Sequence, residues 1–336
     1  KAVMGIEINP GLDKSDFKIV YSPQHGADNI PVRTCLKRLG YDIVPVLAQC
    51  APDPDYTNTK SPNPEVDASY ELAIKLAKEV DADVVAITDP DGDRLGVVAK
   101  HNGEYVLMSG NQSAAVYLEY ILSQRKEKGT LPDNAVMYNT IVTSDLGELV
   151  ARNYGVDVEK TLTGFKFIGD KIRKYEKTHE KQFIFGYEES YGCVVEDFVR
   201  DKDAVQAVLL AAECGNYYKK QGKDLIDVLN ELYAKYGTFK ESQIALAKAG
   251  AAGAARIKEM MDTLRQDKPT EIGGVKVVLS EDYATSERSD GTTIDLPKSN
   301  VLKYYLEDGS WIAARPSGTE PKCKFYFCVV GANQHE

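Results

Sequence analysis

Short apolar runs alternate with helical segments along the first part of the chain. Residues 18–21, 41–46 and 83–88 are rich in β-branched and aromatic side chains, which predicts buried strands. Residues 28–39 and 64–80 repeat apolar positions at intervals near 3.6, which predicts helices. Strands that alternate with helices are typical of a parallel sheet in an α/β layer fold.

The same plan repeats in the second part of the chain, and the pattern changes after residue 242. The repeat predicts strands at 135–138, 156–161 and 182–185 and helices at 145–154, 167–178, 202–221 and 225–236. The pattern in the last part predicts a helix at 251–265 and then strands at 275–279, 301–306, 310–315 and 324–329. We therefore expect two related α/β domains with mainly parallel sheets, residues 18–125 and 126–241, and a small α+β domain, residues 242–336.

Composition narrows the classes of function. The 336 residues are 43% hydrophobic and 27% charged, which suits folded domains with ordinary cores. A net charge of −10 argues against nucleic acid or an anionic membrane as the main partner. No apolar run approaches the ~20 residues of a membrane helix. Six cysteines without a Cys-x-x-Cys pair predict a reduced, cytoplasmic protein.

The most informative stretch is the hexapeptide DPDGDR at residues 89–94, directly after a predicted buried strand. The carboxylates of Asp89, Asp91 and Asp93 alternate, so their oxygens can converge on a hard cation such as Mg²⁺. A calcium-binding EF-hand loop needs Gly at its sixth position and Glu at its twelfth. These positions hold Arg94 and Lys100 here, so an EF-hand is excluded. A solvated acidic turn remains the alternative. Arg94 favours an anion held beside the metal.

Three motifs in the same order give this chain a family resemblance. The hexapeptide resembles the metal loop of the phosphohexomutases, the phosphoglucomutases and phosphomannomutases. The stretches GYEESYG at 186–192 and RPSGTEPK at 315–322 resemble the next two motifs of that family. The resemblance runs from about Lys18 to the end of the chain. It implies two related α/β domains and a C-terminal phosphate-binding domain.

The resemblance also implies roles for the second and third motifs. Glu188 and Ser190 would read the hydroxyl groups of the sugar ring, although an acidic turn explains them otherwise. The third loop would hold the phosphate that does not react, through Arg315, Ser317, Gly318 and Thr319. An arginine fork suits bidentate phosphate binding, and glycine lets backbone N–H groups approach. From the residues alone, this stretch could equally be an ordinary turn.

A fourth match, TGFK at residues 163–166, resembles the family's lysine near the reacting hydroxyl. Lys166 and Arg94 are therefore the catalytic candidates, with a surface lysine as the alternative for Lys166. Residues 164–171 resemble a Walker loop only superficially, because Asp170 breaks the Gly-Lys pair. His25, in a loop that resembles the family's first loop of this domain, is expected to be structural. Residues 200–203 fit a polar contact or an acid-capped helix start equally well.

The family's nucleophile, a phosphorylated serine in a Thr-Ala-Ser-His-Asn-like loop, has no counterpart in these 336 residues. The chain also begins with Lys1. We therefore expect residues 1–17 to be a linker from a missing N-terminal phosphoserine domain, and the chain alone to be inactive. The resemblance implies a hexose phosphate substrate, glucose first, mannose second and a pentose third, with Mg²⁺ and glucose 1,6-bisphosphate as activator. The alternative is a non-catalytic sugar-phosphate binder that has lost its catalytic domain.

Overall fold

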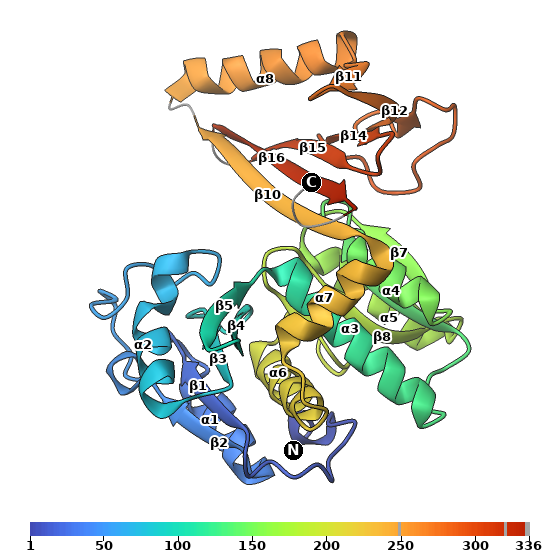
Figure 1. Ribbon diagram of the computed structural model, residues 1–336. Helices are drawn as coiled ribbons and strands as arrows, with labels where there is room; N and C mark the ends of the chain where they lie inside the picture. The colour runs from blue at the N-terminus through green and yellow to red at the C-terminus, as the bar shows by residue number, and fades with distance from the viewer. Residues whose placement is uncertain (248–249, 319–320, 333–336) are drawn as a thin grey trace. The chain divides into compact units, whose positions relative to one another are not determined.

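The structure is a computed structural model that describes residues 1–247, 250–318 and 321–332. The chain divides into two compact units, Lys1–Leu232 and Tyr233–Glu336, and each is described here by itself (Figure 1). Both units contain a sheet covered by helices, as the sequence predicts. Among the described residues, no helix combines the length and the apolar character needed to cross a membrane.

The first sheet of the N-terminal unit has the order β2-β1-β3-β4-β5. Strands β2, β1 and β3 are parallel, and β4 and β5 continue the sheet as an antiparallel hairpin that the sequence analysis did not predict. The hairpin turns at Asn102 and Gly103, both with positive φ. The strands and helices are β1 (Lys18–Ser22), α1 (Asn29–Leu39), β2 (Asp42–Pro45), α2 (Glu71–Val80), β3 (Val84–Thr88), β4 (Leu95–His101) and β5 (Glu104–Met108).

The helix predicted at residues 64–80 begins later than expected. Asn63 Oδ1 accepts a hydrogen bond from the Glu65 backbone N–H at 3.0 Å, and the Tyr70 hydroxyl donates to the Pro64 carbonyl at 2.7 Å. These bonds hold residues 64–66 in a turn. A 3₁₀ helix, Asp67–Tyr70, then leads into α2 at Glu71.

The predicted linker at residues 1–17 is instead packed against the first domain. Ile6 and Phe17 are buried in the core. Lys14 Nζ lies 2.6 Å from Glu7 Oε1, and both side chains are buried. The Asn9 side-chain amide donates to the Tyr120 hydroxyl at 3.0 Å. A free linker could not bury a charged pair in this way, so this segment is packed as part of the N-terminal unit.

The second sheet of the N-terminal unit has the order β7-β6-β8-β9, with β7, β6 and β8 parallel. Helix α3 was not predicted, because it is buried almost all round and shows no polar stripe. It packs against α4, and the predicted domain boundary at residue 125 lies inside it. The elements are α3 (Gly110–Glu127), β6 (Ala135–Thr140), α4 (Leu146–Asn153), β7 (Asp157–Thr161), α5 (Phe165–Thr178), β8 (Gln182–Tyr187), β9 (Cys193–Val194), α6 (Ala204–Lys219) and α7 (Leu225–Tyr236).

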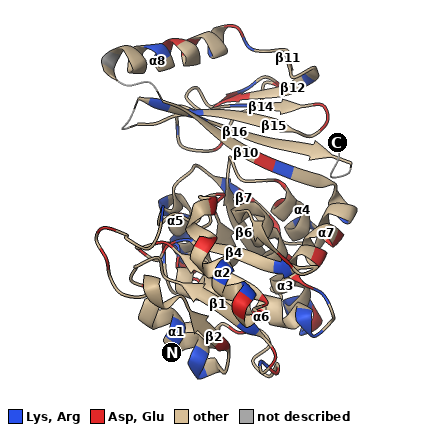
Figure 2. Cartoon of the chain, turned by 60° about the vertical axis from the view of Figure 1, so that its left-hand side comes forward, with Lys and Arg blue, Asp and Glu red and all other residues tan. Residues whose placement is uncertain are grey.

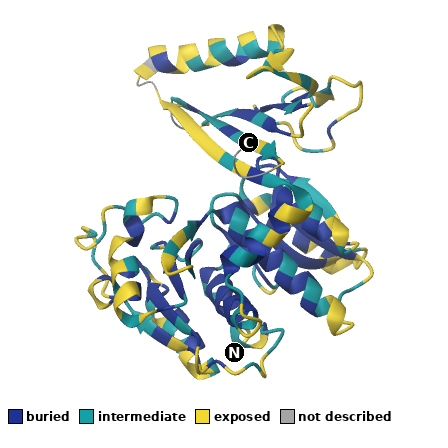
Figure 3. Ribbon diagram, viewed as in Figure 1, coloured by how far each residue is buried: buried dark blue, intermediate teal, exposed yellow. Residues whose placement is uncertain are grey.

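The C-terminal unit is an antiparallel sheet of order β10-β16-β15-β14-β12-β11, with β13 paired to β12. Helix α8 covers one face, where Met261 packs with Leu302, Tyr304 and Cys323. Most residues of edge strand β10 are exposed (Figure 3). The elements are β10 (Thr238–Ala247), α8 (Gly250–Gln266), β11 (Glu271–Ile272), β12 (Val275–Asp282), β13 (Glu287–Arg288), β14 (Leu302–Leu306), β15 (Trp311–Pro316) and β16 (Lys322–Gly331).

The α/β and α+β fold classes predicted from the sequence are thus confirmed, and the first sheet adds an antiparallel half. Charges of both signs are interspersed on helices α2, α3 and α6 rather than gathered by sign (Figure 2). Within the N-terminal unit, parallel strands β1, β3, β7 and β8 end in loops that carry the predicted motifs. The carboxyl ends of such strands are where open α/β sheets build their sites.

Candidate functional site

The acidic loop connects the end of β3 to the start of β4. Asp89 is 6% exposed, and its Oδ1 atom accepts backbone N–H groups from Asp93 at 3.0 Å and from Arg94 at 2.9 Å. Gly92 has a φ of 74°, a left-handed conformation that suits glycine. Oδ1 of Asp89 therefore shapes the loop, and Oδ2 lies on the side of Arg94, 3.6 Å from its Nε atom.

Carboxylate oxygens of Asp89, Asp91 and Asp93 lie within 4.8 Å of one another. Burial raises the pKa of Asp89 to about 7, and a hydrogen bond with Asp93 and the negative charges of Asp93 and Asp91 act in the same direction. Three hard oxygen donors with mutual repulsion are the donor set that Mg²⁺ prefers. The residues present therefore fit the predicted metal.

Two neighbouring segments fix this loop from behind. A Cβ atom on Gly26 would lie 2.5 Å from Pro90 Cα, so the two backbones touch only because residue 26 is glycine. The Ala27 N–H donates to the Pro90 carbonyl at 2.9 Å, and the Ala204 N–H donates to the Gly92 carbonyl at 3.0 Å. The loop after β1 and the start of α6 thus hold the acidic loop in register.

Arg94 lies beside the acids as the sequence analysis expected. Its Nε atom is 3.6 Å from Asp89 Oδ2 and 3.5 Å from Asp93 Oδ1. Its Nη1 atom is 2.9 Å from Glu65 Oε1, an ion pair that the sequence did not indicate. Glu65 therefore orients the guanidinium across the acidic loop.

The GYEESYG loop joins β8 to β9 and is tied to the acidic loop. The Leu95 N–H, just after the acids, donates to the Tyr191 carbonyl at 2.9 Å. Tyr191 has a φ of 69°, so the left-handed residue of this loop is not the one at 187, which is a buried strand residue. Ser190 is half-buried in the loop. The backbone link brings the predicted metal and sugar loops together.

Glu188 is 7% exposed and already engaged within the protein. Its Oε1 atom accepts the Gly164 N–H at 2.8 Å, which joins the GYEESYG loop to the TGFK segment. Its Oε2 atom lies 3.8 Å from Lys202 Nζ. Glu188 therefore connects three of the predicted segments.

Lys202 is the site residue that the sequence analysis left undecided. Its Nζ atom lies 3.0 Å from Asp93 Oδ2, and the side chain is 13% exposed. A Cβ atom on Gly192 would collide with Lys202 Cδ, so the glycine makes room for the lysine. Burial lowers the pKa of Lys202, but the hydrogen bond to Asp93 and the charges of Asp93 and Glu188 outweigh it and raise the pKa above its usual value.

One indication for Lys202 was present in the sequence, its place at the start of a predicted helix. Asp203 Oδ1 accepts the Val205 N–H at 2.9 Å and the Gln206 N–H at 3.3 Å, so the acid-capped helix start is confirmed. That cap also aims the preceding lysine at the acidic loop. Sequence spacing shows the cap but not the contact with Asp93, which is 109 positions away along the chain.

A cavity of about 730 Å³ adjoins these loops. Lys166 is exposed and lies at its wall, with Nζ 5.0 Å from the centroid of the Phe167 ring. The cavity is lined by Gly92, Lys166, Gly169, Asp170, Arg173, Val199, Arg200, Asp201, Lys202 and Asp203. The lining holds four basic and three acidic side chains, and Arg173, Arg200 and Lys202 are ion-paired. Lys166 is the basic side chain of this cavity that is exposed next to the metal loop.

The RPSGTEPK loop belongs to the C-terminal unit and is described by itself. Arg315 is half-buried at the end of β15, with Nη1 3.5 Å from the Tyr326 hydroxyl. The Ser317 N–H donates to the Lys322 carbonyl at 2.8 Å, which closes the loop. A Cβ atom on Gly318 would meet no atom of the described residues within 4 Å. Thr319 lies outside the described residues.

A second cavity, of about 870 Å³, is lined by this loop and α8. Pro316, Ser317 and Gly318 face it from the loop, and Lys258 and Arg265 face it from the helix. Lys258 is paired with Asp262 at 2.9 Å, and Arg265 with Asp282 at 3.0 Å. The helix side therefore supplies little unpaired charge.

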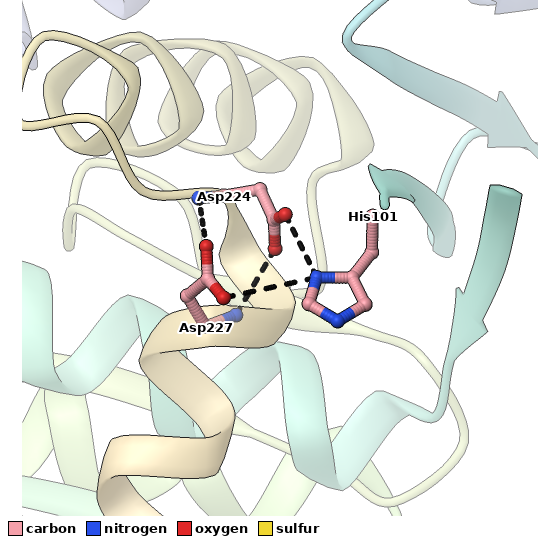
Figure 4. A group of neighbouring side chains, drawn as sticks. All are labelled: His101, Asp224 and Asp227. Atoms are coloured by element: carbon pink, nitrogen blue, oxygen red, sulfur yellow. Dashed lines mark hydrogen bonds and ion pairs between the residues drawn. The ribbon is translucent and has the colours of Figure 1, made fainter. Parts of the chain in front are cut away.

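One further group of candidate metal ligands lies apart from the acidic loop. His101 Nδ1 is 2.8 Å from Asp224 Oδ2 and 3.8 Å from Asp227 Oδ1 (Figure 4). The other oxygens of the two aspartates cap α7: Asp224 Oδ1 accepts the Asp227 N–H at 3.0 Å, and Asp227 Oδ2 accepts the Asp224 N–H at 2.9 Å. A capping box with a histidine partner accounts for the group without a metal.

Comparison with known families identifies three consecutive matches along the chain. Residues 6–103 match "Phosphoglucomutase/phosphomannomutase, alpha/beta/alpha domain II", residues 109–236 match domain III, and residues 248–330 match the C-terminal domain of the same family. Each of the three predicted motifs lies inside one of these matches.

Curated relatives agree with these matches. A phosphoglucomutase of Staphylococcus haemolyticus is 38% identical over 325 residues, 95% of this chain and 58% of that protein. A phosphoglucomutase of Staphylococcus aureus is 38% identical over 322 residues, 94% of this chain and 57% of that protein. The chain thus spans somewhat more than half the length of the curated relatives it matches.

Solved structures share the fold at lower identity. Parafusin, a phosphoglucomutase from Paramecium, has a TM-score of 0.71 at 20% identity, covering 99% of this chain and 57% of that one. An N-acetylphosphoglucosamine mutase from Aspergillus fumigatus, solved with GlcNAc-6P and magnesium, has a TM-score of 0.57 at 15% identity, covering 99% and 61%. At these identities the likeness concerns the fold alone.

Proposed function

Because the chain belongs to the phosphoglucomutase/phosphomannomutase family, we propose that it forms the metal, sugar and phosphate sites of a phosphohexomutase. The reaction moves a phosphoryl group between O1 and O6 of a hexose phosphate. The observation that carries this proposal is the convergence of Asp89, Asp91 and Asp93 beside the Lys202–Glu188 pair, next to a cavity that Lys166 lines. Acidic and basic groups of this kind are what phosphoryl transfer requires.

Mg²⁺ is the proposed cofactor, held by Asp89, Asp91 and Asp93. When bound, it supplies positive charge that stabilises the oxygens of the transferring phosphoryl group. Arg94, held by Glu65 at 2.9 Å, adds a second positive charge at the same place. Lys202 would bind a phosphoryl oxygen once the cation takes over its present partner, Asp93.

The sugar and its second phosphate would be held by the other two loops. Glu188 and Ser190 are proposed to contact ring hydroxyls, with Lys166 near the reacting hydroxyl to take up or return its proton. Arg315, Ser317, Gly318 and Thr319 are proposed to hold the phosphate that does not react. An arginine fork with backbone donors matches the geometry of a phosphate dianion.

The phosphoryl donor would be a phosphoserine outside these 336 residues. In the first half-reaction the serine O–P bond breaks and the sugar hydroxyl oxygen forms the new O–P bond. The hydroxyl proton goes to a base, and the released serine oxygen takes up a proton to become the hydroxyl. The product is a hexose bisphosphate, which returns its other phosphoryl group to the serine. Glucose 1,6-bisphosphate would accordingly act as activator by charging that serine.

Glucose phosphate is the proposed substrate, ahead of mannose phosphate and a pentose phosphate. The curated relatives at 38% identity, which are named phosphoglucomutases, support this order. The Glu188 loop by itself fits any hexose, because an acid and a hydroxyl can bind vicinal hydroxyls of either sugar.

Titration of Mg²⁺ by calorimetry tests the metal site of this proposal. The wild-type chain should bind Mg²⁺ weakly, because three carboxylates leave an incomplete octahedron, and Asp91→Asn should bind about tenfold more weakly. Asp42→Asn is the matched control, because it removes an exposed charge at the opposite end of the parallel strands. Equal affinity in wild type and Asp91→Asn would remove the metal site from the proposal.

A further inference from the structure

Asp28 stands at the start of α1 but does not cap the helix. It occupies the N-cap position, and its side chain makes no capping hydrogen bond. An N-cap aspartate ordinarily accepts a hydrogen bond from the second or third helical N–H. The third helical residue here is Pro31, which has no N–H. The sequence therefore weakens the usual role of this aspartate.

The carboxylate of Asp28 lies instead against the acidic loop. A Cβ atom on Gly92 would be 2.6 Å from the carboxylate carbon and from both of its oxygens. The neighbouring Ala27 N–H donates to the Pro90 carbonyl at 2.9 Å, so backbone contacts fix this approach. Asp28 thus supports the loop at the glycine that lies between Asp91 and Asp93.

The charge of Asp28 has no positive partner among the described residues around it. The side chain is 93% buried, and its Oδ2 atom is buried without a hydrogen-bond donor. The charged groups that act on it are Asp203, from the start of α6, and Asp91, both of them acids. The cations at the loop, Arg94 and Lys202, pair with other residues. A buried carboxylate in this position is costly unless a positive charge compensates it.

We propose that Asp28 is a positioning residue of the metal loop, whose carboxylate supports Gly92 and adds a fourth negative charge for a divalent cation held by Asp89, Asp91 and Asp93. The cation supplies the compensation that the free protein lacks. The inference rests on the Mg²⁺ site of the proposed function. The competing explanation is an acid that stabilises the positive end of α1 through the helix dipole.

Two variants separate these explanations. Asp28→Asn keeps the shape of the side chain and removes its charge, and Asp28→Ser retains a hydroxyl that can accept the Ile30 N–H. Calorimetric titration with Mg²⁺ should give about tenfold weaker binding in both. In chelator-treated protein, the thermal midpoint of Asp28→Asn should rise, because an uncompensated buried charge is removed. Asp42→Asn removes an exposed charge at the start of β2, at the opposite end of the parallel strands. It should leave the Mg²⁺ affinity unchanged.

The outcomes distinguish this inference from the proposed function. Suppose that the wild type binds Mg²⁺ and that Asp91→Asn binds it more weakly. If both Asp28 variants then bind Mg²⁺ as tightly as the wild type does, the inference is overturned and the metal site stands. If the chelator-treated Asp28→Asn protein is less stable than wild type, the helix-dipole role replaces it. If wild type shows no Mg²⁺ binding, the metal site and this inference both fail.

Discussion

Lys202 Nζ lies 3.0 Å from Asp93 Oδ2, so a lysine from the start of α6 neutralises one of the proposed metal ligands. The same ammonium is 3.8 Å from Glu188 on the GYEESYG loop. A cation bound by Asp93 and the Lys202 ammonium repel each other and compete for the same negative charge. In the metal-free chain Lys202 is therefore an internal counter-ion for the acids, and a bound cation has to compete with its charge.

This competition predicts the direction of one mutational effect. Lys202→Met should strengthen Mg²⁺ binding about threefold to tenfold, because Asp93 loses a competing positive charge. The same variant should weaken binding of glucose 6-phosphate in the presence of Mg²⁺, because a phosphate partner is lost. Calorimetry measures both affinities.

Lys166→Met is the matched control for that experiment. Lys166 lines the same cavity but is exposed, and its recorded contact is with the Phe167 ring. Its removal should leave Mg²⁺ affinity within about twofold of wild type, since an exposed charge is screened by salt. Weaker Mg²⁺ binding in Lys202→Met would mean that the lysine orients Asp93 instead of competing for it.

The C-terminal loop gives a second prediction. Arg315→Ala should weaken binding of glucose 6-phosphate more than Arg315→Lys does, because lysine keeps the charge but loses the bidentate fork. A loss of about tenfold for alanine corresponds to one charge-assisted hydrogen-bond pair. Calorimetry with the sugar phosphate measures the difference, and circular dichroism checks that β15 and β16 still fold. If neither change alters affinity, the loop is an ordinary turn.

The acidic loop could be predicted from the sequence because its chemistry is local. Asp89, Asp91 and Asp93 stand within five residues, and an apolar strand precedes them. Arg94 was recognised for the same reason. The partners Glu65 and Lys202 could not be recognised, because each comes from a distant segment and only the folded chain brings them to the loop.

The errors in predicting the fold from the sequence have equally specific causes. Helices α3 and α6 are buried on nearly every side, so they lack the polar stripe that marks a helix in a sequence. The predicted helix at residues 202–221 contains α6, whereas α3 was not predicted. A capping box at Ser109 and Gln112 was an available signal for α3. Residues 1–17 show no helix or strand periodicity, and their packing is seen only in tertiary contacts such as the buried Phe17 and the buried pair of Lys14 with Glu7.

A third prediction concerns pH and the second domain. Glu159 on β7 accepts a hydrogen bond from Tyr175 at 2.7 Å and pairs with Lys171 at 2.8 Å and Lys181 at 3.0 Å. Burial by itself raises the pKa of Glu159, but these partners outweigh it and lower the pKa from 4.5 to about 2. Because the folded pKa is depressed, the stabilisation is present above about pH 4.5 and is lost as the pH falls towards 2.

Glu159→Gln should therefore lower the free energy of unfolding at pH 7 by about 2 kcal/mol, and the difference from wild type should shrink as the pH falls from 4.5 towards 2. Urea denaturation across this range measures it. Asp170→Asn is the control, because its pair with Arg173 is exposed on both sides and should contribute little at any pH. A difference that stays constant down to pH 2 would contradict the assignment.

The last prediction is that the 336-residue chain alone has no mutase turnover, although it binds hexose phosphate. Turnover needs a serine that can store a phosphoryl group and return it. The two serines at the ends of β1 and β6 cannot do this, because Ser22 is fully buried and donates to Gln49 at 2.7 Å, and Ser144 is 1% exposed. Glucose 1-phosphate conversion should therefore be undetectable with Mg²⁺ and glucose 1,6-bisphosphate. It should appear when a separately expressed phosphoserine domain of the family is added.

Turnover by the chain alone that is abolished by Ser22→Ala or Ser144→Ala would show that one of these serines becomes exposed and acts as the nucleophile. Binding without turnover, even with the added domain, would favour a sugar-phosphate-binding protein over an enzyme.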